Sequence, residues 1–162
     1  MAQMKRKDFA HYFDTATSGT LTPEWELEGI GVEALSLSYN PQIDTFKQII
    51  DDVASSTFDS YQIQSSVSGK RIDKDDPIWK WLNEARRKAE SIETKMLEVN
   101  MASGTGSGTL SYEALQYNVL IVINEFLGEN ATISYDVYVK GKPTVGSVTI
   151  TDGKPAFTVS AD

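Results

Sequence analysis

The feature that most constrains this chain is an alternation of apolar and polar residues with a period of two, which recurs along most of its length. In the segment 60–69, for example, Tyr61, Ile63 and Val67 alternate with glutamines and serines. Successive side chains of a β-strand point to opposite faces, so the pattern predicts strands with one buried and one solvated face, as in antiparallel sheets. The same pattern occurs in four further segments: 24–28, 33–40, 94–102 and 133–139.

Two stretches in the C-terminal half refine this prediction. Residues 147–160 resemble a hairpin with Asp152 and Gly153 at its turn, because Asp-Gly suits the two-residue turns that join antiparallel strands. Residues 119–123 are apolar at every position. Both faces of that strand must therefore be covered, either by the fold itself or by a neighbouring subunit.

One helix is predicted at about residues 76–90. Asp76 is a candidate N-cap, and Pro77 takes the first helical position, where its missing N–H costs nothing. Cations fall late in the helix, where the dipole favours them. A stripe at helical spacing should face the core: Ile78, Trp81, Leu82, Ala85 and Ala89. Strands before and after a single packed helix predict an α+β fold with mainly antiparallel sheets.

Composition bounds the class of protein. The length of 162 residues suits one domain, residues 1–162, with a core of its own. The absence of cysteine excludes disulfides and thiolate metal sites, and there is a single histidine. The basic N-terminus lacks a following apolar stretch, and no run is long enough to cross a bilayer. We therefore expect a soluble, cytoplasmic product that makes no membrane contact.

The net charge of −8 is unevenly distributed. Residues 70–95 contain eight Lys/Arg and six Asp/Glu, a net +2, and the other residues contain seven and seventeen, a net −10. An acidic surface repels nucleic-acid phosphates, so tight DNA binding through a basic face is not expected. DNA that slides past without adhering is compatible with this charge.

The glycine-rich segment 102–109 does not match a nucleotide-binding loop. A P-loop requires a lysine after its second glycine, and the next basic residue here is Lys140. The dinucleotide fingerprint fails as well, because a predicted strand follows instead of a helix. The segment is interpreted as a mobile loop.

No set of residues indicates catalysis. The acidic run 73–76 lacks the EF-hand glycine and is explained by helix capping. His11 lies in a short amphipathic stretch that packs its aromatic residues, and Trp25, Trp79 and Trp81 are expected in the core. We therefore predict that the chain is not an enzyme and has no cofactor or metal ion.

The layout of elements resembles the tail tube (major tail) proteins of long-tailed bacteriophages, particularly those with non-contractile tails. In residues 24–50, a Trp-bearing strand ends in Gly29-x-Gly31, a second strand follows, and "YNPQ" opens a long excursion. After the excursion come "SYQIQSSVSGKRI", then "DDPIWKWLNEARR", then a run of strands. The resemblance covers nearly the whole chain and lies in layout, not in one motif.

This resemblance implies a β-sandwich or split barrel of two sheets flanked by a helix. Tail tube proteins form hexameric rings that stack into a hollow tube, and DNA passes through an acidic lumen without specific binding. The implied partners are other copies of the chain and the tape measure, tail-tip and tail-terminator proteins. The implied location is the phage tail of the virion, after assembly in the bacterial cytoplasm.

Two loops are expected to be mobile in a lone subunit and to carry ring-to-ring contacts: residues 40–57 and 102–109. Four aspartates are candidates for lumen or interface positions: Asp44, Asp51, Asp52 and Asp59. Four small residues of the second loop are candidates for the interface: Ser103, Gly104, Gly106 and Gly108.

An alternative from another class is a small β-rich module that binds carbohydrate or protein. A sugar platform would need Trp25 and Trp79 coplanar on a solvent-facing groove. The positions of these two side chains therefore discriminate between the two interpretations.

Overall fold

The computed structural model of the chain describes residues 8–16, 21–32 and 35–160. It contains nine strands and one helix in this part of the chain. In chain order they are β1 (Phe9–Asp14), β2 (Trp25–Leu27), β3 (Pro41–Phe46), β4 (Ser55–Tyr61), β5 (Gln64–Arg71), α1 (Pro77–Lys88), β6 (Ile92–Thr105), β7 (Ser111–Leu127), β8 (Thr132–Thr151) and β9 (Lys154–Val159).

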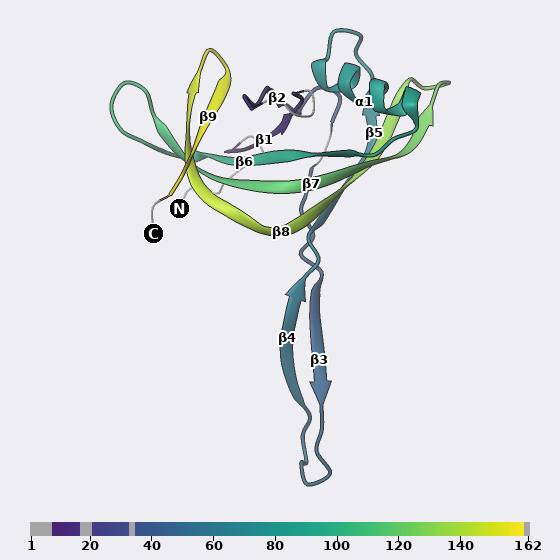
Figure 1. Ribbon diagram of the computed structural model, residues 1–162, viewed down its shortest axis with the longest axis vertical. Coiled ribbons are helices and arrows are strands. Elements are labelled where there is room, and N and C mark those ends of the chain that lie inside the picture. Colours follow the sequence, from purple (N-terminus) through teal and green to yellow (C-terminus); the bar gives the residue numbers. More distant parts are fainter. Residues whose placement is uncertain (1–7, 17–20, 33–34, 161–162) are drawn as a thin grey trace.

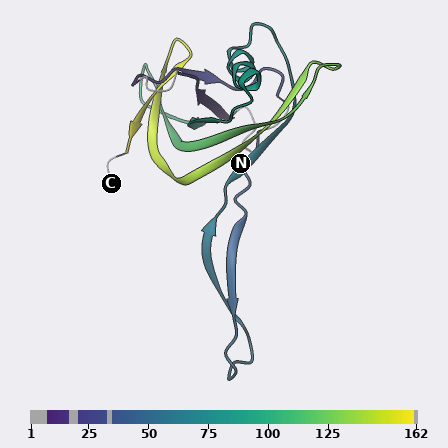
Figure 2. The same cartoon turned by 45° about the vertical axis from the view of Figure 1, so that its right-hand side comes forward.

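Seven strands form one antiparallel sheet in the order β2-β1-β6-β7-β8-β5, with β9 paired to the second half of β8. The sheet curls into a nearly closed, barrel-like body with α1 over one side (Figure 1). Strands β3 and β4 form a separate two-stranded sheet that projects from this body (Figures 1 and 2). The predicted class, α+β with mainly antiparallel strands and one packed helix, is confirmed.

Strands β7 and β8 are long enough to extend from one end of the barrel to the other. They span 17 and 20 residues, and β8 pairs with β5 through its first half and with β9 through its second. Register shifts interrupt their pairing between Gln116 and Asn118 and again between Ile123 and Glu125. Such irregularities increase local twist and bend the strands, which suits a closing sheet.

Two apolar clusters fill the body. The larger one joins α1 to the inner faces of the sheet and includes Phe13, Leu82, Met96, Val119 and Tyr135, all buried. The smaller one lies between β1, β2, β6, β7 and β8. The apolar run 119–123 is thus covered on its inner face, where Val119 and Ile121 are buried, while Val122 on the other face remains exposed.

The helix is confirmed, but it ends at Lys88, and Ala89, predicted to face the core, is exposed. The Asp76 side chain accepts a hydrogen bond from the Ile78 backbone N–H at 3.0 Å, Pro77 is the first helical residue, and the helix ends in a left-handed cap at Ala89. Ile78 and Leu82 are fully buried. At 12 residues, α1 is too short to span a membrane, and so is any other helical stretch in the described part of the chain.

The prediction of a loop over residues 40–57 is wrong, because β3 and the start of β4 lie within it. Neither strand buries a face, so neither carries the alternation that would indicate a strand. The strand predicted at 60–69 is divided between β4 and β5. Of the strand predicted at 33–40, residues 33–34 lie outside the described residues, and the remainder contributes a single β-bridge through Ser38.

The hairpin predicted around Asp152 and Gly153 is confirmed, since both residues have positive φ and join β8 to β9. Strand β9 packs close to β8 at Gly146. A Cβ atom at this position would lie 2.3 Å from the Thr158 carbonyl oxygen and 2.5 Å from the Phe157 ring.

We therefore expect Gly146→Ala to destabilise the protein by about 1–3 kcal/mol, because β9 must shift to accept the methyl group. Gly128→Ala is the matched control, since its Cβ would meet only Phe126, at an ordinary 3.5 Å. Urea denaturation of both variants measures the difference. Equal stabilities would contradict the packing inferred between β8 and β9.

Candidate assembly surfaces

The sheet formed by β3 and β4, together with the residues 47–54 that connect them, is called here the arm. Among the described residues, its two strands pair only with each other, from Pro41 opposite Tyr61 to Phe46 opposite Ser55. An isolated two-stranded sheet is marginally stable in water unless something packs against it. The arm is therefore a two-stranded sheet that packs neither of its faces against the body.

Besides Ile43 and Phe46 on β3, which are exposed, the arm has two groups of apolar side chains. Near the base, the Tyr61 ring lies 4.7 Å from Phe58 and 5.6 Å from Tyr39, measured between centroids. At the tip, Ile49, Ile50 and Val53 are almost wholly exposed. The base thus stabilises the hairpin with its own aromatic contacts, while the tip presents unpaired apolar surface.

The four aspartates predicted for a lumen or interface all lie on the arm. Asp44 is on β3, Asp59 is on β4, and Asp51 and Asp52 are in the tip. The Asp51 carboxylate accepts a hydrogen bond from the Gln48 backbone N–H at 3.1 Å and so shapes the tip. With Lys47, residues 41–61 carry a net charge of −3, from four carboxylates and one lysine.

The base of the arm is attached firmly to the main sheet. Ser38 and Gln64 exchange backbone hydrogen bonds of 2.8 and 2.9 Å, and the Gln62 N–H donates to the Tyr39 carbonyl at 3.0 Å. Asn40 adopts a φ of 41° and donates from its side chain to the Gln62 carbonyl at 3.1 Å. The arm therefore leaves the body at a defined place, next to β5.

The four small residues predicted for the interface lie in a second hairpin, at the β6–β7 turn. Ser103 and Gly104 belong to β6, which runs to Thr105, whereas Gly106 and Gly108 have positive φ and form the turn. The Ser103 hydroxyl donates to the Asn100 carbonyl at 2.7 Å and accepts from the Glu113 N–H at 2.8 Å. Figure 1 shows this hairpin and the arm projecting in different directions.

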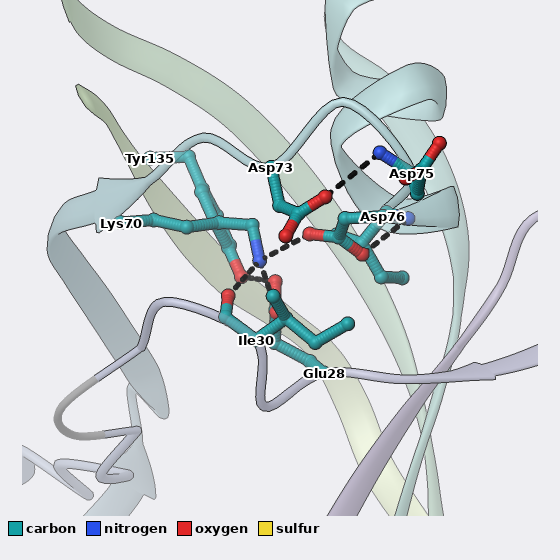
Figure 3. Close-up of polar contacts among 8 residues, drawn as sticks. Glu28, Ile30, Lys70, Asp73, Asp75, Asp76 and Tyr135 are labelled. Atoms are coloured by element: carbon teal, nitrogen blue, oxygen red, sulfur yellow. Dashed lines mark hydrogen bonds and ion pairs between the residues drawn. The ribbon is translucent and has the colours of Figure 1, made fainter. Parts of the chain in front are cut away.

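A buried charge cluster lies where β5, α1 and the segment after β2 meet (Figure 3). The Lys70 ammonium, fully buried, lies 2.6 Å from a Glu28 carboxylate oxygen, 2.8 Å from an Asp76 carboxylate oxygen and 2.6 Å from the Ile30 carbonyl oxygen. The Tyr135 hydroxyl donates to the other Glu28 oxygen at 2.5 Å. One lysine thus connects the end of β5, the helix N-cap and the segment 28–30.

The two carboxylates of this cluster share one cation. Burial raises the pKa of Glu28 above its ordinary value, although Lys70 and Tyr135 oppose the shift by stabilising the carboxylate. Burial also raises the pKa of Tyr135, and the adjacent Glu28 adds to the effect, so this phenol remains a hydrogen-bond donor. We interpret the cluster as structural, because all its members are enclosed by the fold.

The burial of Lys70 was not predicted, because strand alternation gives no reason to place a lysine inside. The register of β5 against β8 shifts between Val67 and Lys70, and Gly69 has a φ of 66°. This bulge turns Lys70 inward. A glycine inside a strand often marks a bulge, and Gly69 was the available signal.

The three tryptophans do not form the sugar platform considered in the sequence analysis. Trp25 is only 5% exposed, and Trp79 stacks on Phe126 with ring centroids 6.2 Å apart. Trp81 packs against Phe13 at 5.9 Å. The arrangement that a carbohydrate-binding module would need is therefore contradicted.

His11 has a structural place on β1. Its Nε2 lies 3.1 Å from a Glu98 carboxylate oxygen on β6, and the side chain is largely buried. Asp73 accepts a hydrogen bond from the Asp75 N–H at 2.9 Å, and Asp76 caps the helix. The acidic run therefore shapes the entry to α1.

The sequence matches no model of a known protein family and no characterised protein sequence. Among solved structures, the fold is similar to a chain of the anti-feeding prophage baseplate, determined by cryo-EM with six-fold symmetry imposed. The TM-score is 0.51 at 8% sequence identity, over 90% of this chain and 96% of the other. The similarity thus covers nearly the whole of both chains and shows a shared fold.

We expect Lys70→Met to destabilise the protein by about 3–5 kcal/mol, because it leaves two buried carboxylates without their cation. The matched control is Lys140→Met, which removes an exposed pair with Glu93 at 3.0 Å and should cost at most about 1 kcal/mol. Chemical denaturation of both variants tests this expectation. Similar losses in the two variants would contradict the structural role of the buried lysine.

Glu28 should give stability a specific pH dependence. Its pKa is higher in the folded state, so the folded protein retains a proton that the unfolded chain releases. The stability that this proton contributes is complete below the unfolded pKa, about 4.3, and is lost as pH rises through the folded pKa. Relative to Glu28→Gln, the free energy of unfolding of the wild type should therefore fall as pH rises through this window.

Tyr135→Phe provides a second variant for the same measurement. It removes the hydroxyl that favours ionised Glu28, so the pKa of Glu28 in the folded state should rise further. The fall in the free energy of unfolding should then extend to higher pH. Denaturation curves between pH 4 and 8 provide the comparison. Parallel profiles for wild type and Glu28→Gln would show that Glu28 does not titrate differently in the two states.

Proposed function

We propose that the chain is a non-catalytic structural subunit of a phage virion, which assembles as hexameric rings stacked into a tail tube. The observation that carries the proposal is the arm, which extends beyond the body and ends in exposed apolar side chains (Figure 1). Apolar surface of this kind on a soluble protein marks an interaction site. The fold shared with a chain of a six-fold symmetrised baseplate supports a role in an assembly of this class.

The free edges of the main sheet support ring formation. The path of paired strands begins at β2, and β9 pairs only with β8, so each of these two strands leaves one edge without a strand partner in the described part of the chain. Unpaired edges recruit other strands, and closure with neighbouring subunits removes them. Six subunits joined through these edges would form a continuous barrel around a channel.

The outer face of β7 also supports contact with a neighbour. Leu120 is opposite Tyr138 of β8, and Val122 follows on the same face. Val122 and Tyr138 are both exposed. The apolar run that the sequence predicted to need cover on both faces thus has cover on one face only, and a ring neighbour would supply the other.

The charge of the protein suits a conduit for DNA. Its net charge is −8, and the arm alone contributes −3. A wall of this sign repels phosphates and favours passage over adhesion. In this proposal, Asp44, Asp51, Asp52 and Asp59 serve the lumen or the interface, and the tape measure, tail-tip and tail-terminator proteins are the further partners.

Negative-stain electron microscopy of the purified protein at high concentration tests the proposal directly. We expect six-fold rings or hollow tubes, together with a large species in size-exclusion chromatography. A strict monomer at every concentration would contradict self-assembly. Rings of another symmetry would contradict the hexamer while leaving a structural role.

Removal of the arm should abolish stacking but not folding. Replacing residues 41–61 by one glycine joins Asn40 to Gln62, which already lie within hydrogen-bond distance. Because arm residues are mostly exposed, the melting temperature should change by only a few degrees, about 1 kcal/mol in stability. Tubes formed by the folded variant would contradict the proposed role of the arm.

A milder variant keeps the arm and changes only its tip. Ile49→Ser, Ile50→Ser and Val53→Ser together remove the exposed apolar surface and should also prevent stacking. Val145→Ser with Val159→Ser is the control, because both valines are also exposed, at 59% and 61%, but lie on the body. Loss of assembly in both sets would indicate a general solubility effect instead of a specific contact.

A further inference from the structure

A patch that combines apolar and basic groups lies where α1 meets the end of β7. It consists of Trp79, Arg86, Phe126 and Leu127 and is called here the helix patch. The rings of Trp79 and Phe126 stack at 6.2 Å with an interplanar angle of 12°. Phe126 is nevertheless 40% exposed and Leu127 43%. The register shift between Ile123 and Glu125 turns Phe126 toward the helix.

The basic part of the patch has no acidic ion-pair partner among the described residues. The Arg86 guanidinium carbon lies 4.2 Å from the centroid of the Phe126 ring, a cation–π contact. Its hydrogen bonds, of 3.1 and 2.9 Å, go to the Asn83 side-chain oxygen. Within residues 8–16, 21–32 and 35–160, none of Lys80, Arg86, Arg87 and Lys88 forms an ion pair. The helix thus carries a net +3 from four cations and Glu84.

The arm tip has the complementary composition. It presents Ile49, Ile50 and Val53 as exposed apolar groups, with Asp51 and Asp52 beside them. The arm tip has apolar groups flanked by carboxylates, and the helix patch has apolar groups flanked by cations. The two surfaces are therefore complementary in charge. Complementary charge gives such a contact its orientation and specificity.

The two surfaces lie at opposite ends of the molecule. In Figures 1 and 2, the tip of the arm points away from the body, while α1 and the β7–β8 turn occupy the other end. One subunit therefore cannot bring its own tip to its own patch. Two subunits stacked in the same orientation would bring the tip of one toward the patch of the other.

We propose that the arm tip of one subunit docks on the helix patch of a subunit in the adjacent ring. The contact is heterologous, so it repeats from ring to ring without closing on itself. This contact rests on the proposed stacking of rings. It identifies the surface that receives the arm tip in the adjacent ring. Arg86 and Arg87 pair with the tip carboxylates, while Ile49, Ile50 and Val53 cover Phe126 and Leu127.

Cysteine cross-linking tests this contact, because the chain contains no cysteine of its own. The double variant Ile50→Cys/Leu127→Cys places one thiol at the tip and one in the patch. Oxidation should produce a ladder of covalent oligomers, since each subunit links to one above and one below. Ile50→Cys/Val159→Cys is the matched control, with an exposed position outside the patch, and should not give a ladder.

Charge reversal tests specificity in the same background. Arg86→Glu with Arg87→Glu should reduce the yield of ladder at least tenfold, and Asp51→Lys with Asp52→Lys should do the same. All four changes in one chain should restore the ladder, because the charges are again complementary. A ladder that is insensitive to both reversals would overturn the proposal.

Electron microscopy of the same samples separates the two proposals. Stacked rings without a ladder overturn the helix patch as acceptor and leave the tube intact. A ladder without rings supports the contact and contradicts the hexameric tube. Absence of both contradicts both.

Discussion

The buried ammonium of Lys70 is the interaction on which the geometry of this protein depends. It holds together three segments far apart in the chain: Glu28 after β2, the end of β5, and Asp76 at the start of α1. A buried cation is tolerated only when its partners are in place, so the three segments must assemble together. Since β5 also anchors the base of the arm through Gln64, the cluster fixes the helix relative to the point where the arm emerges.

The body and the arm differ in how much apolar surface they bury. The body is stabilised by two continuous apolar clusters and long paired strands, whereas the arm has one pair of strands and few buried groups. The apolar core of the described residues therefore lies in the body, and the arm contributes little to it.

Much of the body could be predicted from the sequence, because strands that bury one face show an alternation of apolar and polar residues. The alternation around Ile133 and Tyr135, the Asp152-Gly153 turn and the cap at Asp76 each reflect a local rule, and the structure confirms them. The strands of the arm were not predicted, because strands without a buried face need not show this alternation. Gly69 signals the bulge that turns Lys70 inward, but local composition does not encode the register shift that the bulge produces.

The separation of arm tip and helix patch to opposite ends has a consequence for polarity. A filament joined through these surfaces has unlike termini, one presenting free arms and the other presenting free acceptors. A factor that starts such a filament and a factor that stops it must therefore differ in chemistry. The factor at the end with free arms would offer them an apolar, basic surface. The factor at the end with free helix patches would offer them an apolar, acidic surface. The polarity of the filament would thus follow from the structure of the single subunit.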